Sequence, residues 1–341
     1  MDTHASGSEP AADSPALLPT VLASAGVSRG DVARIVPLAG GTYNTVLRVV
    51  LRDGRDWVLK VPPRRDTPGL RYERDLLRSE AAFCAAARTV GDARVPEVVR
   101  ADLVPGPAGG PWLLTTTRPG TPWSDLAEDI TAPERSRMRE ELGRVVARLH
   151  TATGPGFGYP SGALGPLAPT WREAFTAMTD AVLDDAARYG VRLPQPPERL
   201  RNRLAAVAGV LDDVERPAAV HFDLWNGNLL VHGPPGERAV GGVVDGERMF
   251  WGDPVADFVS LALLGDIETD RDFLRGYAAA GGVARFDASV RTRLAMYRCY
   301  LYLIMLVETV PRAASPEQCA RVREQVAPCL LAALDALEAT P

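Results

Sequence analysis

The segment from residue 34 to residue 62 restricts the possible folds more than any other part of the chain. It reads RIVPLAGGTYNTVLRVVLRDGRDWVLKVP and carries β-favouring residues such as Val49 and Val50 in short runs. Asp53-Gly54, between two of these runs, is a strong hairpin signal. The segment therefore predicts a small antiparallel sheet, with Lys60 on its third strand.

Most of the remaining chain has the periodicity of helices, with apolar residues every three or four positions. Two further strands are predicted at 95–104 and 110–117, and two strand-loop pairs at 218–233 and 239–254. The predicted helices are a short one near 16–25, then 71–89, 134–150, 170–189 and 197–214, followed by a helical region from 254 onward.

Pro119-Gly120 breaks the chain after the last strand of the β-rich part. The elements predict a bilobal α+β protein, with a small antiparallel sheet and one long helix in the N-terminal lobe and a larger, mainly helical C-terminal lobe. We expect a disordered tail at 1–14, because its residues are small and polar, an N-terminal lobe at 15–117 and a C-terminal lobe at 118–341.

Composition excludes several classes of protein. With 46% hydrophobic and 24% charged residues, the chain has the composition of an ordinary globular protein. The net charge of −5 without a basic block makes nucleic acid an unsuitable partner. No apolar run reaches the ~18 residues of a membrane span, so a cytoplasmic protein is predicted. Four cysteines without C-x-x-C spacing are expected to be reduced core thiols: Cys84, Cys299, Cys319 and Cys329.

Two segments carry the residue types of a catalytic centre. The run from His221 to Asn228, HFDLWNGN, places Asp223 and Asn228 in a loop before an apolar strand. Asp245 follows Val243-Val244 and ends the next strand. One carboxamide and two carboxylates on adjoining elements supply the oxygen ligands that Mg²⁺ prefers.

These motifs resemble the aminoglycoside phosphotransferase family of small-molecule kinases, which have a protein-kinase-like fold. The H-x-D-x-x-x-x-N loop followed by an Asp is the specific part of the resemblance. Gly40-Gly41-Thr42 looks like the phosphate loop, and Gly252 to Asp257 looks like the segment that supports the catalytic loop. The similarity spans about residues 34 to 310.

The resemblance implies roles for the loop residues. Asp223 would accept the proton of the acceptor hydroxyl, or orient that hydroxyl, as it attacks the γ-phosphorus of ATP or GTP. Asn228 and Asp245 would hold Mg²⁺. His221 would keep the loop in shape, with direct catalysis by His221 as the alternative.

The resemblance also implies a nucleotide site in the N-terminal lobe, formed by Gly40, Gly41 and Thr42 with Lys60 and its helical partner. That partner would be Glu80, with Glu73 as the competing candidate. The hinge would contact the purine through backbone groups, and its residues are Thr116 and Arg118.

Lys60 is the single lysine among 38 basic residues, all the others being arginine. A chain that uses Arg wherever charge alone is needed retains Lys where only a slim ammonium fits. A lysine that reaches between two phosphates meets that description.

The sequence departs from the family at two positions. The family usually has glycine between the loop His and Asp, where this chain has Phe222, and often an aromatic residue after the second Asp, where it has Gly246. We expect a change of packing and no loss of activity, because neither position supplies a functional oxygen.

The acceptor is less constrained. The segment Gly156 to Pro160 with Thr170-Trp171-Arg172 resembles hygromycin-type phosphotransferases, and D-L-W-x-G-N occurs in fructosamine kinases. We expect an antibiotic hydroxyl as acceptor, with a metabolic kinase for a fructosamine, choline-like or sugar acceptor as the alternative and a nucleotide-binding pseudokinase as the third. Acidic residues at 184–185 and 266–270 could attract a polycation, although a run of charges more often forms a solvated face. The protein would be a monomer or homodimer.

Overall fold

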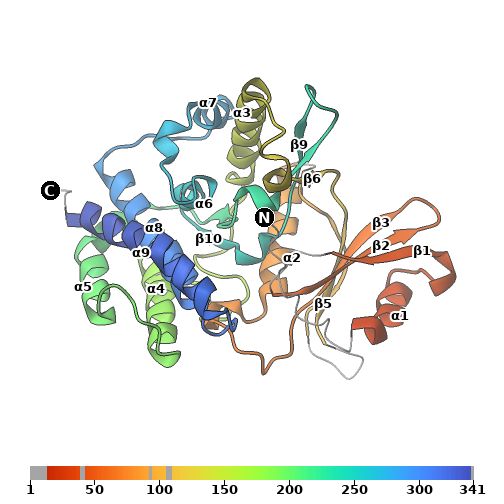
Figure 1. Ribbon diagram of the computed structural model, residues 1–341, viewed down its shortest axis with the longest axis horizontal. Helices are drawn as coiled ribbons and strands as arrows, with labels where there is room; N and C mark the ends of the chain where they lie inside the picture. The colour runs from red at the N-terminus through yellow and green to blue at the C-terminus, as the bar shows by residue number, and fades with distance from the viewer. Residues whose placement is uncertain (1–13, 39–42, 92–93, 105–109, 339–341) are drawn as a thin grey trace. The chain divides into compact units, whose positions relative to one another are not determined.

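The computed structural model describes residues 14–38, 43–91, 94–104 and 110–338. Contacts divide the chain into two compact units, Met1–Thr67 with Pro96–Arg118 and Pro68–Val95 with Pro119–Pro341. Figure 1 shows the elements of both units. The tail expected at 1–14 lies outside the described residues apart from Ser14, where the first helix begins.

An antiparallel sheet forms the first unit, as the sequence predicts. Its strands are β1 (Val32–Pro37), β2 (Thr45–Leu51), β3 (Asp56–Val61), β4 (Val98–Asp102) and β5 (Trp112–Thr116), in the order β1-β2-β3-β5-β4. Gly54 turns the chain between β2 and β3 with φ +90°, a conformation that costs glycine little. Helix α1 (Ser14–Ser24) contributes Val21 and Leu22 to the same buried cluster as Leu59 and Leu114.

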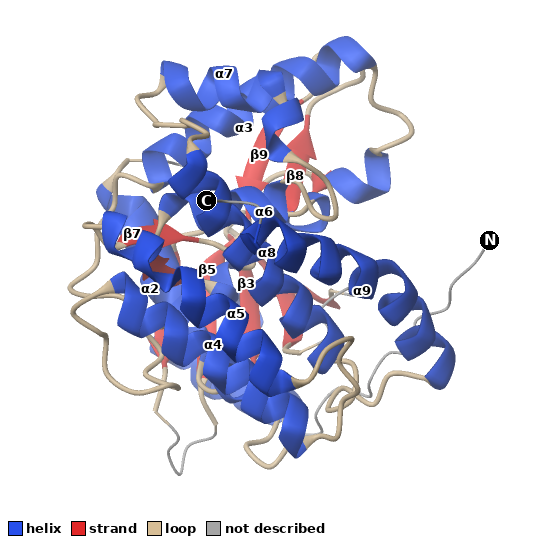
Figure 2. Ribbon diagram, turned by 90° about the vertical axis from the view of Figure 1, so that its left-hand side faces the viewer, coloured by secondary structure: helices blue, strands red, loops and turns tan. Residues whose placement is uncertain are grey.

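Helices make up most of the second unit (Figure 2). They are α2 (Leu76–Thr89), α3 (Ala132–Leu149), α4 (Trp171–Arg188), α5 (Pro197–Val207), α6 (Asp257–Leu261), α7 (Arg271–Ala279), α8 (Ala288–Val307) and α9 (Pro316–Glu338). Two small antiparallel sheets complete the unit. One pairs β7 (Ala218–Val220) with β10 (Phe250–Gly252), and the other joins β6 (Thr121–Pro122), β8 (Leu229–His232) and β9 (Ala239–Val243).

Glycines allow α3 and α7 to pack closely. A Cβ atom at Gly143 of α3 would lie 2.2 Å from the carbonyl oxygen of Phe273, and one at Gly276 of α7 would lie 1.8 Å from that of Glu140. The two helices are therefore in backbone contact. Helices α8 and α9 also pack along one another.

The sequence prediction is wrong in detail at several places. The helix expected over 71–89 begins at Leu76, because Asp75 has φ +57° and separates it from a 3₁₀ turn, η2 (Arg71–Glu73). Helix α5 ends at Val207 and is followed by a 3₁₀ helix.

All four cysteines are free thiols, but only Cys84 and Cys299 are buried, so the core position expected of the other two is wrong. In the described ranges, every helix is too short or too polar to cross a bilayer.

Candidate active site

The loop from His221 to Asn228 connects β7 to β8, and a buried carboxylate holds its first residues. Asp257 on α6 accepts hydrogen bonds from the amides of His221 (3.1 Å) and Phe222 (2.6 Å). Nε2 of His150, which follows α3, lies 2.8 Å from the same carboxylate. Charge-assisted hydrogen bonds of this kind fix the loop backbone, so the predicted supporting role is confirmed for Asp257.

Phe222 has a left-handed backbone, φ +62°. A residue with a side chain pays about 1–2 kcal/mol for that conformation, whereas glycine does not. The Phe222 ring is fully buried, with its centroid 5.0 Å from that of Phe250 and 5.5 Å from that of Tyr300. Burying an aromatic ring of this size contributes about 1.5–3 kcal/mol, which offsets the strain. The chain therefore holds Phe222 in a conformation that glycine would adopt without strain.

Asn228 orients Asp223. Its Nδ2 atom donates to the backbone carbonyl (2.9 Å) and to Oδ2 (3.0 Å) of Asp223. Asn228 is 7% exposed, so this pair of hydrogen bonds is protected from water. The carboxylate and the carboxamide predicted from the loop motif are thus in direct contact.

Both ring nitrogens of His221 take part in hydrogen bonds within the site. The amide of Asp223 donates to Nδ1 (3.2 Å), and Nε2 lies 3.0 Å from the carbonyl oxygen of Val244. Since a carbonyl only accepts, the proton of the neutral ring belongs on Nε2. His221 thereby joins the loop to the segment that carries Asp245.

A chain of partly buried charges ends at Asp223. Arg248 Nε lies 3.8 Å from Asp223 Oδ2, and Arg248 also pairs with Glu308 (3.0 Å). Arg312 contacts Glu308 (3.1 Å) and Glu73 (2.5 Å). Burial raises the pKa of Asp223, and the positive charge of Arg248 opposes that rise. Arg248 and Glu308 were not predicted from the sequence, because their pairing joins distant segments.

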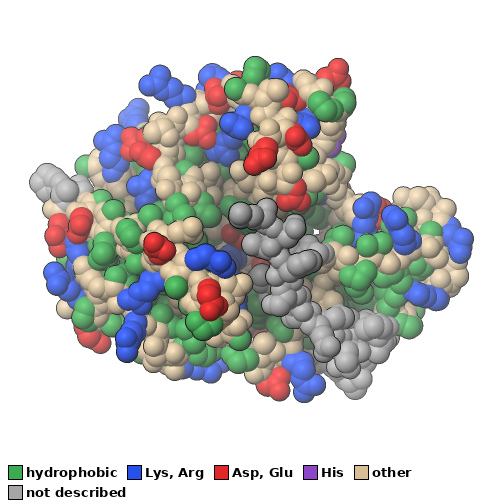
Figure 3. All heavy atoms as spheres, viewed as in Figure 1, with side chains coloured by type: hydrophobic (Ala, Val, Ile, Leu, Met, Phe, Trp, Pro, Cys, Tyr) green, Lys and Arg blue, Asp and Glu red, His purple; other side chains and the backbone are tan. Residues whose placement is uncertain are grey.

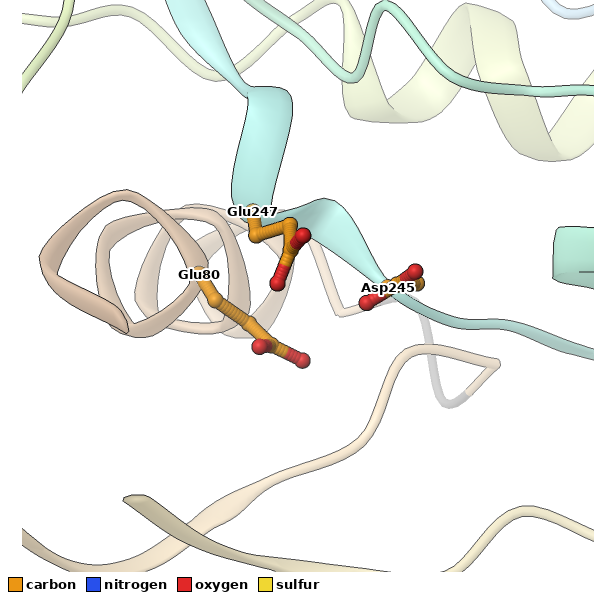
Figure 4. A group of neighbouring side chains, drawn as sticks. All are labelled: Glu80, Asp245 and Glu247. Atoms are coloured by element: carbon orange, nitrogen blue, oxygen red, sulfur yellow. The ribbon is translucent and has the colours of Figure 1, made fainter. Parts of the chain in front are cut away.

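Three carboxylates come together where α2 meets the segment after Asp245 (Figure 4). One oxygen each of Glu80, Asp245 and Glu247 lies within 4.8 Å of the other two. Glu80 is 3% exposed and Glu247 is 9% exposed. Negative groups this close and this buried favour a cation among them. Glu247 was missed in the sequence, although it stands two residues after a predicted ligand.

This donor set fits Mg²⁺, which takes carboxylate and carbonyl oxygens and keeps positions for phosphate. Asn228 adjoins the segment that carries Asp245 and Glu247, because the amide of Val244 donates a hydrogen bond to the Asn228 carbonyl (3.0 Å). With Nδ2 of Asn228 turned to Asp223, Oδ1 is the side-chain atom suited to a cation. The predicted ligands Asn228 and Asp245 thus lie on connected segments.

Gly246, the second departure from the family, makes room for α2. A Cβ atom at Gly246 would lie 2.3 Å from the ring of Phe83. The Phe83 ring also packs edge-on against His221, with centroids 4.9 Å apart. A ring from α2 therefore occupies the space directly beside residue 246.

The remaining predicted residues belong to the first unit. Lys60 is 9% exposed on β3, opposite Val46 of β2 and Leu113 of β5. Thr116 ends β5, and its amide donates to the carbonyl of Glu97 (2.9 Å), so that N–H is used within the sheet. Arg118 ends the unit. The predicted phosphate loop, Gly40, Gly41 and Thr42, lies outside the described residues.

Solved structures share this fold. A Thermobifida fusca protein provisionally assigned as a fructosamine-3-kinase is 24% identical, with a TM-score of 0.63, and the alignment covers 93% of this chain and 99% of that one. A thermostable mutant of an aminoglycoside phosphotransferase, in complex with AMP-PNP and hygromycin B, is 17% identical, with a TM-score of 0.62 and coverages of 96% and 99%. A macrolide 2'-phosphotransferase type I is 17% identical, with a TM-score of 0.58 and coverages of 94% and 99%. A search of curated protein sequences found no match.

The sequence model described as "Phosphotransferase enzyme family" matches residues 34–297. These residues include the loop, the carboxylate cluster and the strand that carries Lys60. The predicted resemblance, the kinase-like fold and the predicted phosphotransferase are thereby confirmed. The chain belongs to the phosphotransferase enzyme family.

Proposed function

We propose that the protein transfers the γ-phosphate of ATP or GTP to a hydroxyl group of a small molecule, in a reaction that requires Mg²⁺. The observation that carries this proposal is the fixed geometry around Asp223. Its backbone follows residues anchored by Asp257, and its carboxylate is held by Asn228. A preorganised carboxylate in a phosphotransferase is suited to receive the proton of an attacking hydroxyl.

In the proposed reaction, the acceptor oxygen forms a bond to the γ-phosphorus, the bond from phosphorus to the β,γ-bridging oxygen breaks, and the hydroxyl proton moves to Asp223. ADP or GDP leaves. Asp245 and Asn228 would hold Mg²⁺ together with Glu247, and the bound ion would neutralise phosphate charge. His221 acts as a positioning residue, because both of its ring nitrogens are used by neighbouring backbone groups.

Nucleotide binding would fall to the residues that the family resemblance indicates. Lys60 would contact the α- and β-phosphates and pair with Glu80, while Gly40, Gly41 and Thr42 would cover the phosphates and Thr116 and Arg118 would form the hinge. The complex of one structural neighbour with AMP-PNP supports a nucleoside triphosphate as donor.

For the acceptor, we propose an antibiotic, of the aminoglycoside kind or a related one, so that the reaction would confer resistance. The aminoglycoside and macrolide phosphotransferases among the structural neighbours support this choice. The provisional fructosamine-3-kinase supports the alternative, a metabolic small-molecule kinase.

A turnover assay tests the proposal. The purified chain is incubated with Mg²⁺ and γ-labelled ATP or GTP, with hygromycin B, a macrolide or a fructosamine as acceptor. Transfer of label to an acceptor hydroxyl is expected. Nucleotide binding without transfer to any acceptor and without hydrolysis would contradict the proposal and would favour the pseudokinase.

A further inference from the structure

A pocket of about 740 Å³ opens within the second unit, next to the catalytic loop. Its lining includes Trp225 and Asn226, which follow Asp223 in the loop. Ser260 also lines it and accepts a hydrogen bond from the amide of Leu224 (3.0 Å). The wall of the pocket therefore begins within two residues of the proposed base.

An aromatic ring forms part of this wall. Trp225 is 42% exposed, far more than the buried Trp123 that also lines the pocket. A Cβ atom at Gly227 would lie 2.2 Å from the Trp225 ring, so the ring rests on the loop backbone and only glycine fits beneath it. Leu263, 37% exposed, adds a second apolar side chain. Exposed apolar surface that is held in place at a pocket suits the apolar face of a ligand ring.

The carboxylates of the pocket are already paired with arginines. Asp270 contacts Arg139 at 2.5 Å, with side-chain exposures of 24% and 12%. Asp266 lies 3.2 Å from Arg298, and Asp272 has the same kind of partner in Arg275, at 2.6 Å. These Asp–Arg pairs offer hydrogen-bond donors and acceptors to the hydroxyl groups of a ligand, and their opposite charges leave no strong negative potential in the pocket.

The second acidic cluster, Asp184-Asp185, is neutralised in the same way. Arg71 lies 2.7 Å from Asp184 and 3.3 Å from Asp185, and Arg201 also contacts Asp184. Figure 3 shows acidic and basic side chains interspersed over the visible face, without an extended acidic area. A polycation would therefore gain little from either cluster that the sequence suggested for it.

We infer that this pocket binds the acceptor, and that the acceptor presents a hydroxylated ring of low charge, such as a sugar, and is not a polycationic amine. The inference rests on the proposed phosphotransferase function. Among the acceptors proposed above, it favours molecules of low charge over the aminoglycosides, which are polycations. The ring would stack on Trp225, and its hydroxyl groups would bond to the paired Asp and Arg side chains. One hydroxyl would point along the loop toward Asp223.

Calorimetric binding at two salt concentrations tests the charge class without requiring turnover. The probes are erythromycin and fructosyl-lysine, which carry sugar hydroxyls and little net charge, and kanamycin as a polycation. We expect one of the low-charge probes to bind with a Kd that changes less than about threefold between 0.05 and 0.5 M NaCl, because salt screens mainly interactions between charges. Strongest binding by kanamycin with a steep salt dependence, or no binding by either low-charge probe, would overturn the inference.

Substitution of the ring tests the pocket. Trp225→Ala should raise the Kd of the bound probe roughly threefold to tenfold, the range of an aromatic stacking contact, and Trp225→Phe should raise it less. The nucleotide Kd should not change in either variant. Val310→Ala is the control, because Val310 is similarly exposed (44%) and does not line the pocket.

The two proposals can fail separately. Acceptor binding that depends on Trp225 but leads to no phosphate transfer would contradict the proposed function and leave the pocket assignment standing. Phosphate transfer with an acceptor KM that is the same in Trp225→Ala would overturn the pocket assignment and leave the function standing.

Discussion

The amide of Phe222 donates a 2.6 Å hydrogen bond to the buried carboxylate of Asp257. This contact joins α6 to the catalytic loop at the one loop residue with a left-handed backbone. Asp223 follows Phe222 directly in the chain, so the position of Asp223 depends on this hydrogen bond to Asp257.

Asp257→Asn keeps the size of the side chain but should loosen the loop from His221 to Asn228. The carboxamide replaces one acceptor oxygen by a donor that faces backbone N–H groups, so at least one charge-assisted hydrogen bond is lost, worth about 1.5–3 kcal/mol. We expect the free energy of unfolding to fall by about 2 kcal/mol and kcat to fall with it, in urea titrations and turnover assays. Asp335→Asn, at an exposed ion pair of α9, is the control and should change neither; equal stability of the two variants would contradict the anchor.

Phe222→Gly should destabilise the protein although it restores the family's usual residue. Loss of a buried aromatic side chain costs about 3–5 kcal/mol, and relief of the left-handed strain returns about 1–2 kcal/mol. The expected net loss is about 2 kcal/mol in the free energy of unfolding, with a smaller loss for Phe222→Leu. A glycine variant as stable as the parent would contradict this prediction, because packing against Phe250 and Tyr300 would then be worth no more than the strain.

The activity should depend on pH through Asp223. Because burial raises its pKa above the usual value and a base must be ionised, kcat should fall as the pH falls through that raised pKa. Arg248→Met removes a positive charge that lowers the pKa of Asp223, so the fall of kcat on the acidic side of the pH profile should move to higher pH. The sign is opposite for stability. Because the folded protein holds this proton more tightly, the stabilisation is fully present below the unfolded-state pKa and is lost as the pH rises through the raised folded-state pKa.

Arg323→Met is the matched control for this pH profile, because Arg323 is exposed on α9, where it donates a hydrogen bond to the carbonyl of Arg192. Its profile should coincide with that of the parent. An acidic limb that stays in place or moves to lower pH in Arg248→Met would contradict the assigned role of Arg248.

Lys60→Arg should preserve the charge and the fold but reduce turnover. Lys60 is 9% exposed on a central strand. In its proposed role the ammonium reaches between two phosphates, where the wider guanidinium would not fit. We expect kcat/KM for the nucleotide to fall at least about tenfold, equivalent to about 1.4 kcal/mol of transition-state stabilisation. Normal kinetics with arginine would mean that the single lysine has no special role.

Local patterns were sufficient to predict part of this structure. The hairpin at Gly54 and the strand of Lys60 follow from turn chemistry and β-favouring runs, and the periodicity of 134–150 predicted α3 (Ala132–Leu149) closely. The loop motif placed Asp223 beside Asn228 correctly. These features depend on residues that are near one another in the sequence.

Long-range contacts explain what the sequence did not reveal. Glu308 and Arg248 meet because α8 packs near the loop, and Gly246 is explained only by Phe83 on α2. The helix predicted over 71–89 is interrupted at Asp75, next to the buried Glu73, whose carboxylate accepts a hydrogen bond from the amide of Leu70. The arginine partners of the acidic clusters also come from distant segments, such as Arg71 for Asp184 and Arg139 for Asp270, so local sequence does not reveal them.

The most direct test of the central claim is the turnover of Asp223→Asn. The parent and the variant are compared with the same acceptor and labelled nucleotide, and nucleotide Kd is measured separately. Loss of a general base should lower kcat about 10²- to 10⁴-fold while the nucleotide Kd stays within about twofold. Undiminished transfer of phosphate by Asp223→Asn would contradict the assignment of Asp223 as the base.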